Sequence, residues 1–164
     1  MWLEPPEWLG AQLATRFPLH LISDQPQRWL HGQLDHSPLS VPGKIDGREP
    51  VYLNREDAAE RCIVHGRVVK VFNDRGSCLA AAIPSADIAR GVARLSTGAW
   101  FDPAENGPEK HGNPNVLTMD RGASGLSQGC AAQTCLVEVI AYEEPLPTVT
   151  AHSLPVLRSQ RGIG

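Results

Sequence analysis

The stretch RVVKVFNDRGSCLAAAI, residues 67–83, decides the fold of this chain. Its first seven residues are rich in valine and end on Phe72 and Asn73, which is the strongest strand signal in the sequence. Asp74-Arg75-Gly76 supplies a tight turn, and the alanine-rich run after it returns as an antiparallel partner. Because alanine side chains are small, this returning strand is expected to pack closely against another layer.

Shorter strand signals lie on both sides of this hairpin. Asn54 is placed to cap a short helix from Arg55 to about Cys62, with Asp57 able to reach back to the start of the helix. Six or so short strands with one or two short helices predict a mainly β barrel or sandwich, and not a doubly wound sheet. The remaining strands are expected at residues 19–23, 51–53, 92–96 and 134–142.

Composition excludes several classes of protein. The formal charge of the 164-residue chain is −3, and no basic run is available to neutralise phosphates, so nucleic acid is not an expected partner. No apolar run approaches the ~20 residues that span a bilayer, so membrane insertion is not expected. The four cysteines form neither a CxxC motif nor a doubled zinc pattern, which favours reduced thiols in a cytoplasmic-type environment.

The chain divides into three parts. Residues 1–16 are expected to be a linker, because Pro5 and Pro6 block a helix while Trp2 and Trp8 offer apolar anchors for a preceding domain that the chain lacks. Residues 17–142 hold the strands, and residues 37–50 read as a surface connection with little fixed structure. The proline-rich segment 143–164 is expected to be a loose tail.

Two polar loops are candidates for binding a ligand. The longer one, residues 111–135, places Asn113 and Asn115 beside Pro114 and then alternates glycines with serines and Gln128. Such a loop offers backbone N–H groups and amide side chains, while its glycines let the backbone approach a ligand closely. The shorter one, residues 28–35, carries an arginine, a histidine and an amide just beyond the strand at 19–23. Alternatively, the histidine of this shorter loop caps a turn and the arginine is solvated.

Catalytic motifs fail on spacing. Leu126 stands where a G-x-S-x-G elbow needs its second glycine, and neither G-x-G-x-x-G nor the P-loop pattern occurs. A zinc site from His111, Cys130 and Cys135 lacks a fourth ligand nearby, so the two cysteines are better explained as small buried residues. We find no nucleophile with a base and assign no catalytic and no metal-binding residue. The sequence therefore offers groups to hold a ligand and few to transform one.

Several motifs together resemble the C-terminal domain of the dimethyl sulfoxide reductase family, with the nearest likeness to biotin sulfoxide and trimethylamine N-oxide reductases. The resemblance implies a molybdopterin-dinucleotide-binding domain over residues 17–142, folded as a six-stranded double-psi β-barrel of the aspartate-decarboxylase-like type. The motifs that carry it are LHLISDQP at 19–26, LHGQLD at 30–35, NDRG at 73–76, LSTGAW at 95–100, KHGNPNVLT at 110–118 and QGCAAQT at 128–134.

The resemblance also implies a cofactor and the residues that bind it. Enzymes of the family reduce S-oxides or N-oxides at a molybdenum held by two pyranopterin guanine dinucleotides (Mo-bis-MGD) and a serine side chain. Where the family commonly has Arg, Ser and Thr, this chain has Trp29, Gly32 and Ala123, which puts one phosphate contact and two hydroxyl contacts in doubt. The implied cofactor-binding residues are Ser23, Gln25, His31, Gln33, Asn113, Asn115, Gln128 and Gly129.

No segment resembles the domains that supply the molybdenum-binding serine. The chain is therefore expected to be a fragment, inactive alone and without bound cofactor, whose partners are the remaining domains of the enzyme. A larger exported enzyme would place it in the periplasm. A stand-alone double-psi-barrel interaction module and a small zinc hydrolase using His111 and the cysteines are the alternatives.

Overall fold

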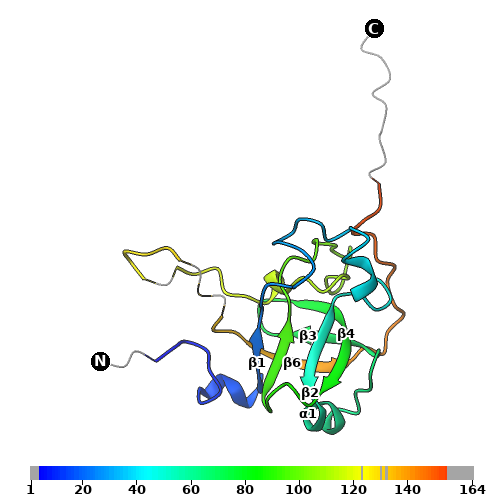
Figure 1. The fold of residues 1–164 in the computed structure, drawn as a ribbon. Coiled ribbons are helices and arrows are strands. Elements are labelled where there is room, and N and C mark those ends of the chain that lie inside the picture. The colour runs from blue at the N-terminus through cyan, green and yellow to red at the C-terminus, as the bar shows by residue number, and fades with distance from the viewer. Residues whose placement is uncertain (1–3, 123, 130, 132, 155–164) are drawn as a thin grey trace.

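Six short strands close into one barrel in the computed structural model, which describes residues 4–122, 124–129, 131 and 133–154 (Figure 1). The only helical elements among these residues are one short α-helix and three 3-10 turns. The strands are β1 (Leu19–Ile22), β2 (Pro50–Asn54), β3 (Val68–Phe72), β4 (Ser77–Ser85), β5 (Val92–Leu95) and β6 (Leu136–Ala141), and the helical elements are η1 (Gln12–Thr15), η2 (Val41–Gly43), α1 (Arg55–Glu60) and η3 (Pro114–Val116).

The strands follow the order β1-β5-β2-β4-β3-β6 around the barrel. The expected hairpin is confirmed, because β3 pairs antiparallel with β4 from Val68↔Ala81 to Phe72↔Ser77. Two pairs are parallel, β1 with β5 and β2 with β4, and every other pair is antiparallel. This closed arrangement confirms the predicted six-stranded double-psi β-barrel.

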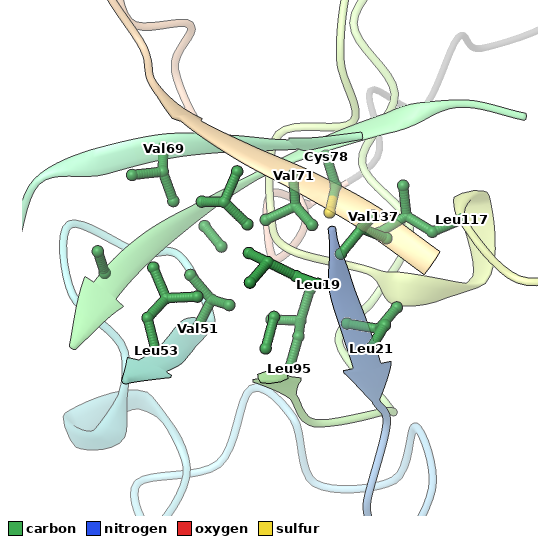
Figure 2. Packing of buried hydrophobic residues seen from close by; sticks show 14 of the residues in the cluster. Leu19, Leu21, Val51, Leu53, Val69, Val71, Cys78, Leu95, Leu117 and Val137 are labelled. Carbon is green, nitrogen blue, oxygen red and sulfur yellow. The ribbon is translucent and has the colours of Figure 1, made fainter. Parts of the chain in front are cut away.

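The interior of the barrel is apolar and fully closed to solvent. Leu21, Leu53 and Val71 each have 0% exposure, and Figure 2 shows labelled side chains from several strands pointing toward one another. Ala80 and Ala82 of β4 belong to the same buried core cluster as these larger side chains. Burying a Leu or Val side chain contributes roughly 1.5–3 kcal/mol, so this interior stabilises the barrel.

The cap of α1 is the one predicted, but one of its acidic side chains has another role. Asn54 accepts a hydrogen bond from the backbone N–H of Glu56 at 2.8 Å. Asp57 was expected to reach back to the helix start, and this is wrong. Its carboxylate instead accepts from the backbone N–H of Gly91 at 2.7 Å and from Arg90 at 3.1 Å. Asp57 therefore fixes the turn before β5.

Both end segments contact the barrel. In the segment expected to be a linker, Glu7 is only 4% exposed and accepts from the backbone N–H of Leu136 at 2.7 Å, at the start of β6. In the segment expected to be a loose tail, the carbonyl of Pro147 accepts from Arg48 at 2.6 Å, and Thr150 and His152 make further bonds described below. No helix in the described part of the chain is long and apolar enough to cross a membrane.

Candidate functional site

The loop after β1 brings together two of the residues implied as cofactor contacts. Gln25 Nε2 lies 3.1 Å from His31 Nδ1, and the backbone N–H of His31 donates to Gln25 Oε1 at 3.3 Å. His31 has a positive φ of 52°, an uncommon conformation for a non-glycine residue. The side chain of Gln33 is exposed and has no hydrogen-bond partner among the described residues. Ser23 Oγ is buried and likewise unpartnered.

A second segment supports this loop. Gly98 has a φ of +100°, and a Cβ at this position would collide with the carbonyl oxygen of His31. Trp100 lies beside it, and its indole N–H donates to the carbonyl of Gly32. Only a glycine at 98 permits this close approach, so the STGAW motif positions the His31 loop. The sequence analysis did not predict this role of Gly98 and Trp100. The available signal was a glycine just after the strand that ends at Leu95.

Asn113 and Asn115 form a separate turn that depends on one buried carboxylate. Asn113 accepts from the backbone N–H of Asn115 at 2.9 Å, and the side chain of Asn115 is exposed at η3. Glu109 accepts from the backbone N–H groups of Gly112 and Asn113 at 2.8 Å each. It also accepts from those of His111 at 3.0 Å and of residue 102 at 3.1 Å. Burial raises the pKa of Glu109 in spite of these bonds.

Residues 124–129 belong to an excursion that reaches away from the barrel (Figure 1), and this segment contains Gln128 and Gly129. Both are exposed, and Gln128 donates to the carbonyl of Ser124 at 3.3 Å within the same excursion. The one side-chain hydrogen bond from this loop to the first, among the described residues, is made by Gln133, which donates to the carbonyl of Ser23 at 3.2 Å. The longer loop is therefore tied to the shorter one near its C-terminal end, at Gln133. Gln128 makes no described contact with the other residues implied as cofactor contacts. Ala123 and Cys130 lie outside the described residues.

Cys135 is a packing residue between the two loops. Its carbonyl accepts from the N–H of Leu21 at 2.9 Å, and its thiol donates to the carbonyl of Leu117 at 3.3 Å. Burial raises the pKa of Cys135 to about 11, so the thiol is protonated at neutral pH. His111, the other described member of the disfavoured zinc site, bonds to the carbonyl of Trp100 instead. The end of the longer loop at Cys135 therefore lies beside β1, just before the shorter loop.

Residues of these loops and of the neighbouring connections form a buried charged cluster, which we define as Asp35, Lys44, Glu49, Glu109 and His111. Residues 37–50 were expected to be a surface connection with little fixed structure. Many of them are exposed, but the expectation of little fixed structure is wrong because the segment also places buried side chains. The Lys44 ammonium lies 2.7 Å from Asp35 Oδ1 and 3.1 Å from Glu49 Oε2, with all three side chains at most 4% exposed. The backbone joins the two halves of the cluster, because Glu49 N–H donates to the carbonyl of His111 at 2.9 Å.

One cation serves two carboxylates in this cluster, and their pKa values move apart. Burial alone would raise the pKa of Asp35, but hydrogen bonds from Lys44 and His152 outweigh it, so the pKa lies below its usual range. Burial raises the pKa of Glu49 to about 7, because Lys44 compensates it only in part. Burial lowers the pKa of His111. Near neutral pH the cluster therefore holds a charged Asp35, a neutral His111 and a Glu49 that is half protonated.

A polar hollow of about 270 Å³ opens beside the first loop. Arg28 and Ser96 line it, together with Arg94, which Asp24 holds at 2.9 Å and which lies 5.1 Å over the ring of Tyr52. Trp29, which stands where the resembled family commonly has Arg, is only 8% exposed. Arg28, one place earlier, is exposed and also lines the hollow.

Comparison with known families and proteins gives one consistent result. Residues 19–136 match the family described as the molydopterin dinucleotide binding domain. Over 142 residues the chain is 52% identical to a biotin sulfoxide reductase of Cereibacter sphaeroides, covering 86% of the chain and 19% of that protein. It is 46% identical over 162 residues to a trimethylamine-N-oxide reductase of Salmonella typhimurium, covering 95% of the chain and 19% of that protein. The chain thus spans about a fifth of the length of these relatives.

Two further comparisons extend this result. A dimethyl sulfoxide/trimethylamine N-oxide reductase of Cereibacter sphaeroides is 39% identical over 158 residues, covering 94% of the chain and 19% of that protein. Among solved structures, acetylene hydratase from Pelobacter acetylenicus matches 87% of this chain and 21% of its own, with a TM-score of 0.70 and 15% identity. At that identity the likeness concerns the fold alone.

Proposed function

We propose that this chain, which belongs to the molydopterin dinucleotide binding domain family, is the cofactor-binding domain of an S-oxide or N-oxide reductase. The single observation that carries the proposal is the family match over residues 19–136. This range contains both polar loops and all eight residues implied as cofactor contacts. The relatives that support the choice of reaction are a biotin sulfoxide reductase and trimethylamine-N-oxide reductases.

The residues present fit a molybdopterin guanine dinucleotide. Ser23 offers a buried hydroxyl that has no partner within the described part of the chain, and a polar ligand atom would satisfy it. His31, Gln33 and Asn115 expose imidazole and amide groups, which can donate to and accept from the edges of a pterin or a guanine. Arg28 at the polar hollow carries a guanidinium cation that can pair with a phosphate. The neighbouring indole of Trp29 is neutral and cannot form an ion pair.

The division of labour follows from these groups. When bound, the cofactor supplies the molybdenum centre at which oxygen is transferred from the substrate. The side chains of this chain hold the dinucleotide and orient it, and no acid, base or nucleophile is assigned to them. Gly98 and Trp100 keep the His31 loop in shape before the ligand binds, which lowers the cost of ordering it. Substrate choice would then reside in other domains.

The remaining domains of the enzyme are the proposed partners of this chain. The chain spans 19% of its curated relatives, so four fifths of such an enzyme lies outside it. The isolated chain is accordingly proposed to bind cofactor weakly and to have no reductase activity.

Titration of the folded chain with molybdopterin guanine dinucleotide released from a molybdoenzyme tests the proposal. We expect saturable binding, weakened about 10-fold or more by His31→Ala, because this change removes the imidazole that faces the ligand. His65→Ala is the matched control, since His65 is also exposed but lies in the loop between α1 and β3. A folded chain that binds no dinucleotide would refute the proposal, as would equal binding by His31→Ala and His65→Ala.

A further inference from the structure

Two histidines and an aspartate converge from three distant segments. Asp35 ends the loop after β1, His111 precedes η3, and His152 lies in the C-terminal segment. One potential ligand atom from each lies within 4.8 Å of the other two. Within the described residues this is the one group of three or more His, Cys, Asp or Glu side chains with such a spacing.

The two ring nitrogens of His111 differ, because one is hydrogen-bonded and the other has no partner among the described residues. Its Nδ1 lies 2.9 Å from the carbonyl oxygen of Trp100. A carbonyl can only accept, so Nδ1 carries the proton and Nε2 presents its lone pair. The side chain of His111 has 0% exposure, so water does not reach Nε2. This nitrogen also has no hydrogen-bond partner among the described residues. A histidine that donates one ring N–H to a backbone carbonyl and keeps the other nitrogen free is the usual arrangement of a metal ligand.

Asp35 and His152 complete the group. Asp35 Oδ2 lies 2.9 Å from His152 Nε2 and 3.8 Å from His111 Nδ1, and it accepts from the N–H of Trp100 at 3.2 Å. Its other oxygen, Oδ1, contacts Lys44 at 2.7 Å. His152 has a side-chain exposure of 27%, so the group is open to solvent on one side. An ion can therefore reach Asp35 and His111 past His152.

We propose that Asp35, His111 and His152 form a binding site for a divalent transition-metal ion such as Zn²⁺. Two imidazoles and one carboxylate are a common three-ligand set for zinc and leave a fourth position for water. Nitrogen ligands disfavour Ca²⁺ and Mg²⁺, which prefer oxygen. The ion takes the place of the hydrogen bond between His152 Nε2 and Asp35 Oδ2, and a neutral His152 ring then carries its one proton on Nδ1. Lys44 carries a positive charge next to Asp35, so we expect weaker binding than at a closed structural zinc site.

Binding of the ion has a structural consequence. His152 is the one ligand that comes from the C-terminal segment, and Thr150 nearby is already hydrogen-bonded to Asp102 and Lys110. A metal bridging His152 to His111 would fasten this segment to the barrel next to Trp100, which supports the His31 loop. The proposal rests on geometry alone and stands independently of the proposed cofactor.

The test is titration of the metal-free chain with Zn²⁺ and with Co²⁺, monitored by calorimetry and by the visible absorption of bound Co²⁺. All proteins carry Cys62→Ser, because Cys62 is an exposed thiol that could bind the probe. We expect one ion per chain and a loss of at least 10-fold in affinity for His152→Ala and for His111→Gln. His65→Ala should bind like the parent protein.

Two results would overturn the proposal. One is a folded parent chain that binds neither ion. The other is His152→Ala binding with the affinity of His65→Ala. His111 is fully buried, so if His111→Gln fails to fold, the partly exposed His152 decides the matter by itself. Circular dichroism of each variant separates loss of a ligand from loss of the fold.

Discussion

The apolar interior of the barrel and the buried charged cluster are equally closed to solvent but are built from different parts of the chain. Leu53 and Val71 come from strands and have 0% exposure. Lys44 and Glu109 come from connections between strands, yet their side chains are buried just as the strand residues are. In the interior each contact depends on volume, whereas in the cluster each depends on a particular partner. The cluster should therefore be the more sensitive of the two to loss of a single group.

Lys44→Met gives the largest expected loss of stability. The change keeps the length and apolar character of the stem but leaves Asp35 and Glu49 buried without their shared cation. Breaking a buried pair by removing one partner costs about 3–5 kcal/mol. Urea unfolding measures this loss. Lys70→Met on β3 is the control and should cost less than about 1 kcal/mol, since Lys70 makes no ion pair among the described residues. Equal losses in the two variants would contradict the pairing argument.

Leu53→Ala tests the apolar side of the comparison. Removing a fully buried leucine leaves a cavity and costs about 2–5 kcal/mol, with the smaller values where neighbours relax into the space. We expect about 3 kcal/mol, somewhat below the loss in Lys44→Met, from thermal and urea unfolding. Leu126→Ala is the control on the exposed excursion and should change stability by less than about 0.5 kcal/mol. A larger loss in Leu53→Ala than in Lys44→Met would reverse the ranking of the two regions.

Glu49→Gln tests whether the charged cluster makes the free energy of unfolding depend on pH, which the apolar interior cannot do. The pKa of Glu49 is about 7 in the folded chain and 4.5 ordinarily, so between these values the folded state keeps a proton that the unfolded state has lost. The contribution of Glu49 is therefore fully present below pH 4.5 and is lost as pH rises through 7. Over this window the free energy of unfolding of the parent, relative to that of Glu49→Gln, should fall by up to about 3 kcal/mol. The slope is at most ~1.4 kcal/mol per pH unit.

Urea unfolding at a series of pH values measures this difference. His111 and Asp35 are present in both proteins, so their titration largely cancels. A difference that rises with pH, or stays flat, would mean that Lys44 holds Glu49 charged in the folded chain.

Local signals predicted a barrel or sandwich of about six strands, and the family resemblance specified the double-psi barrel. Neither identified the buried charged cluster. The hairpin of β3 and β4 and the cap at Asn54 depend on neighbours in sequence, so residue type and spacing were sufficient to find them. The pairing of Lys44 with Asp35 depends on where two connections meet after the barrel has closed. Residues 37–50 are rich in charge, proline and glycine, a composition typical of surface loops, and nothing local marks their charges as buried.

The candidate site divides in the same way. The motifs identified the family, and the residue pattern predicted two polar loops as binding candidates. The structure shows that Gln25 and His31 of the first loop are in contact. Sequence alone could not find the supports of these loops, because Gly98 and Glu109 act on residues far away along the chain or through backbone groups. The cofactor contacts themselves, including that of Gln128, remain predictions.

Gln128→Ala should have the smallest effect on stability and still affect function. Gln128 is exposed on the excursion and, among the described residues, donates only to the carbonyl of Ser124, so we expect a change below about 0.5 kcal/mol. If its amide contacts the dinucleotide, the full-length enzyme with this change should retain less molybdenum and release less GMP on hydrolysis. Gln12→Ala in η1 is the control, because it removes an equally exposed amide far from both loops in sequence. Unchanged molybdenum and GMP contents would remove Gln128 from the site and confine cofactor binding to the loops that contact the barrel.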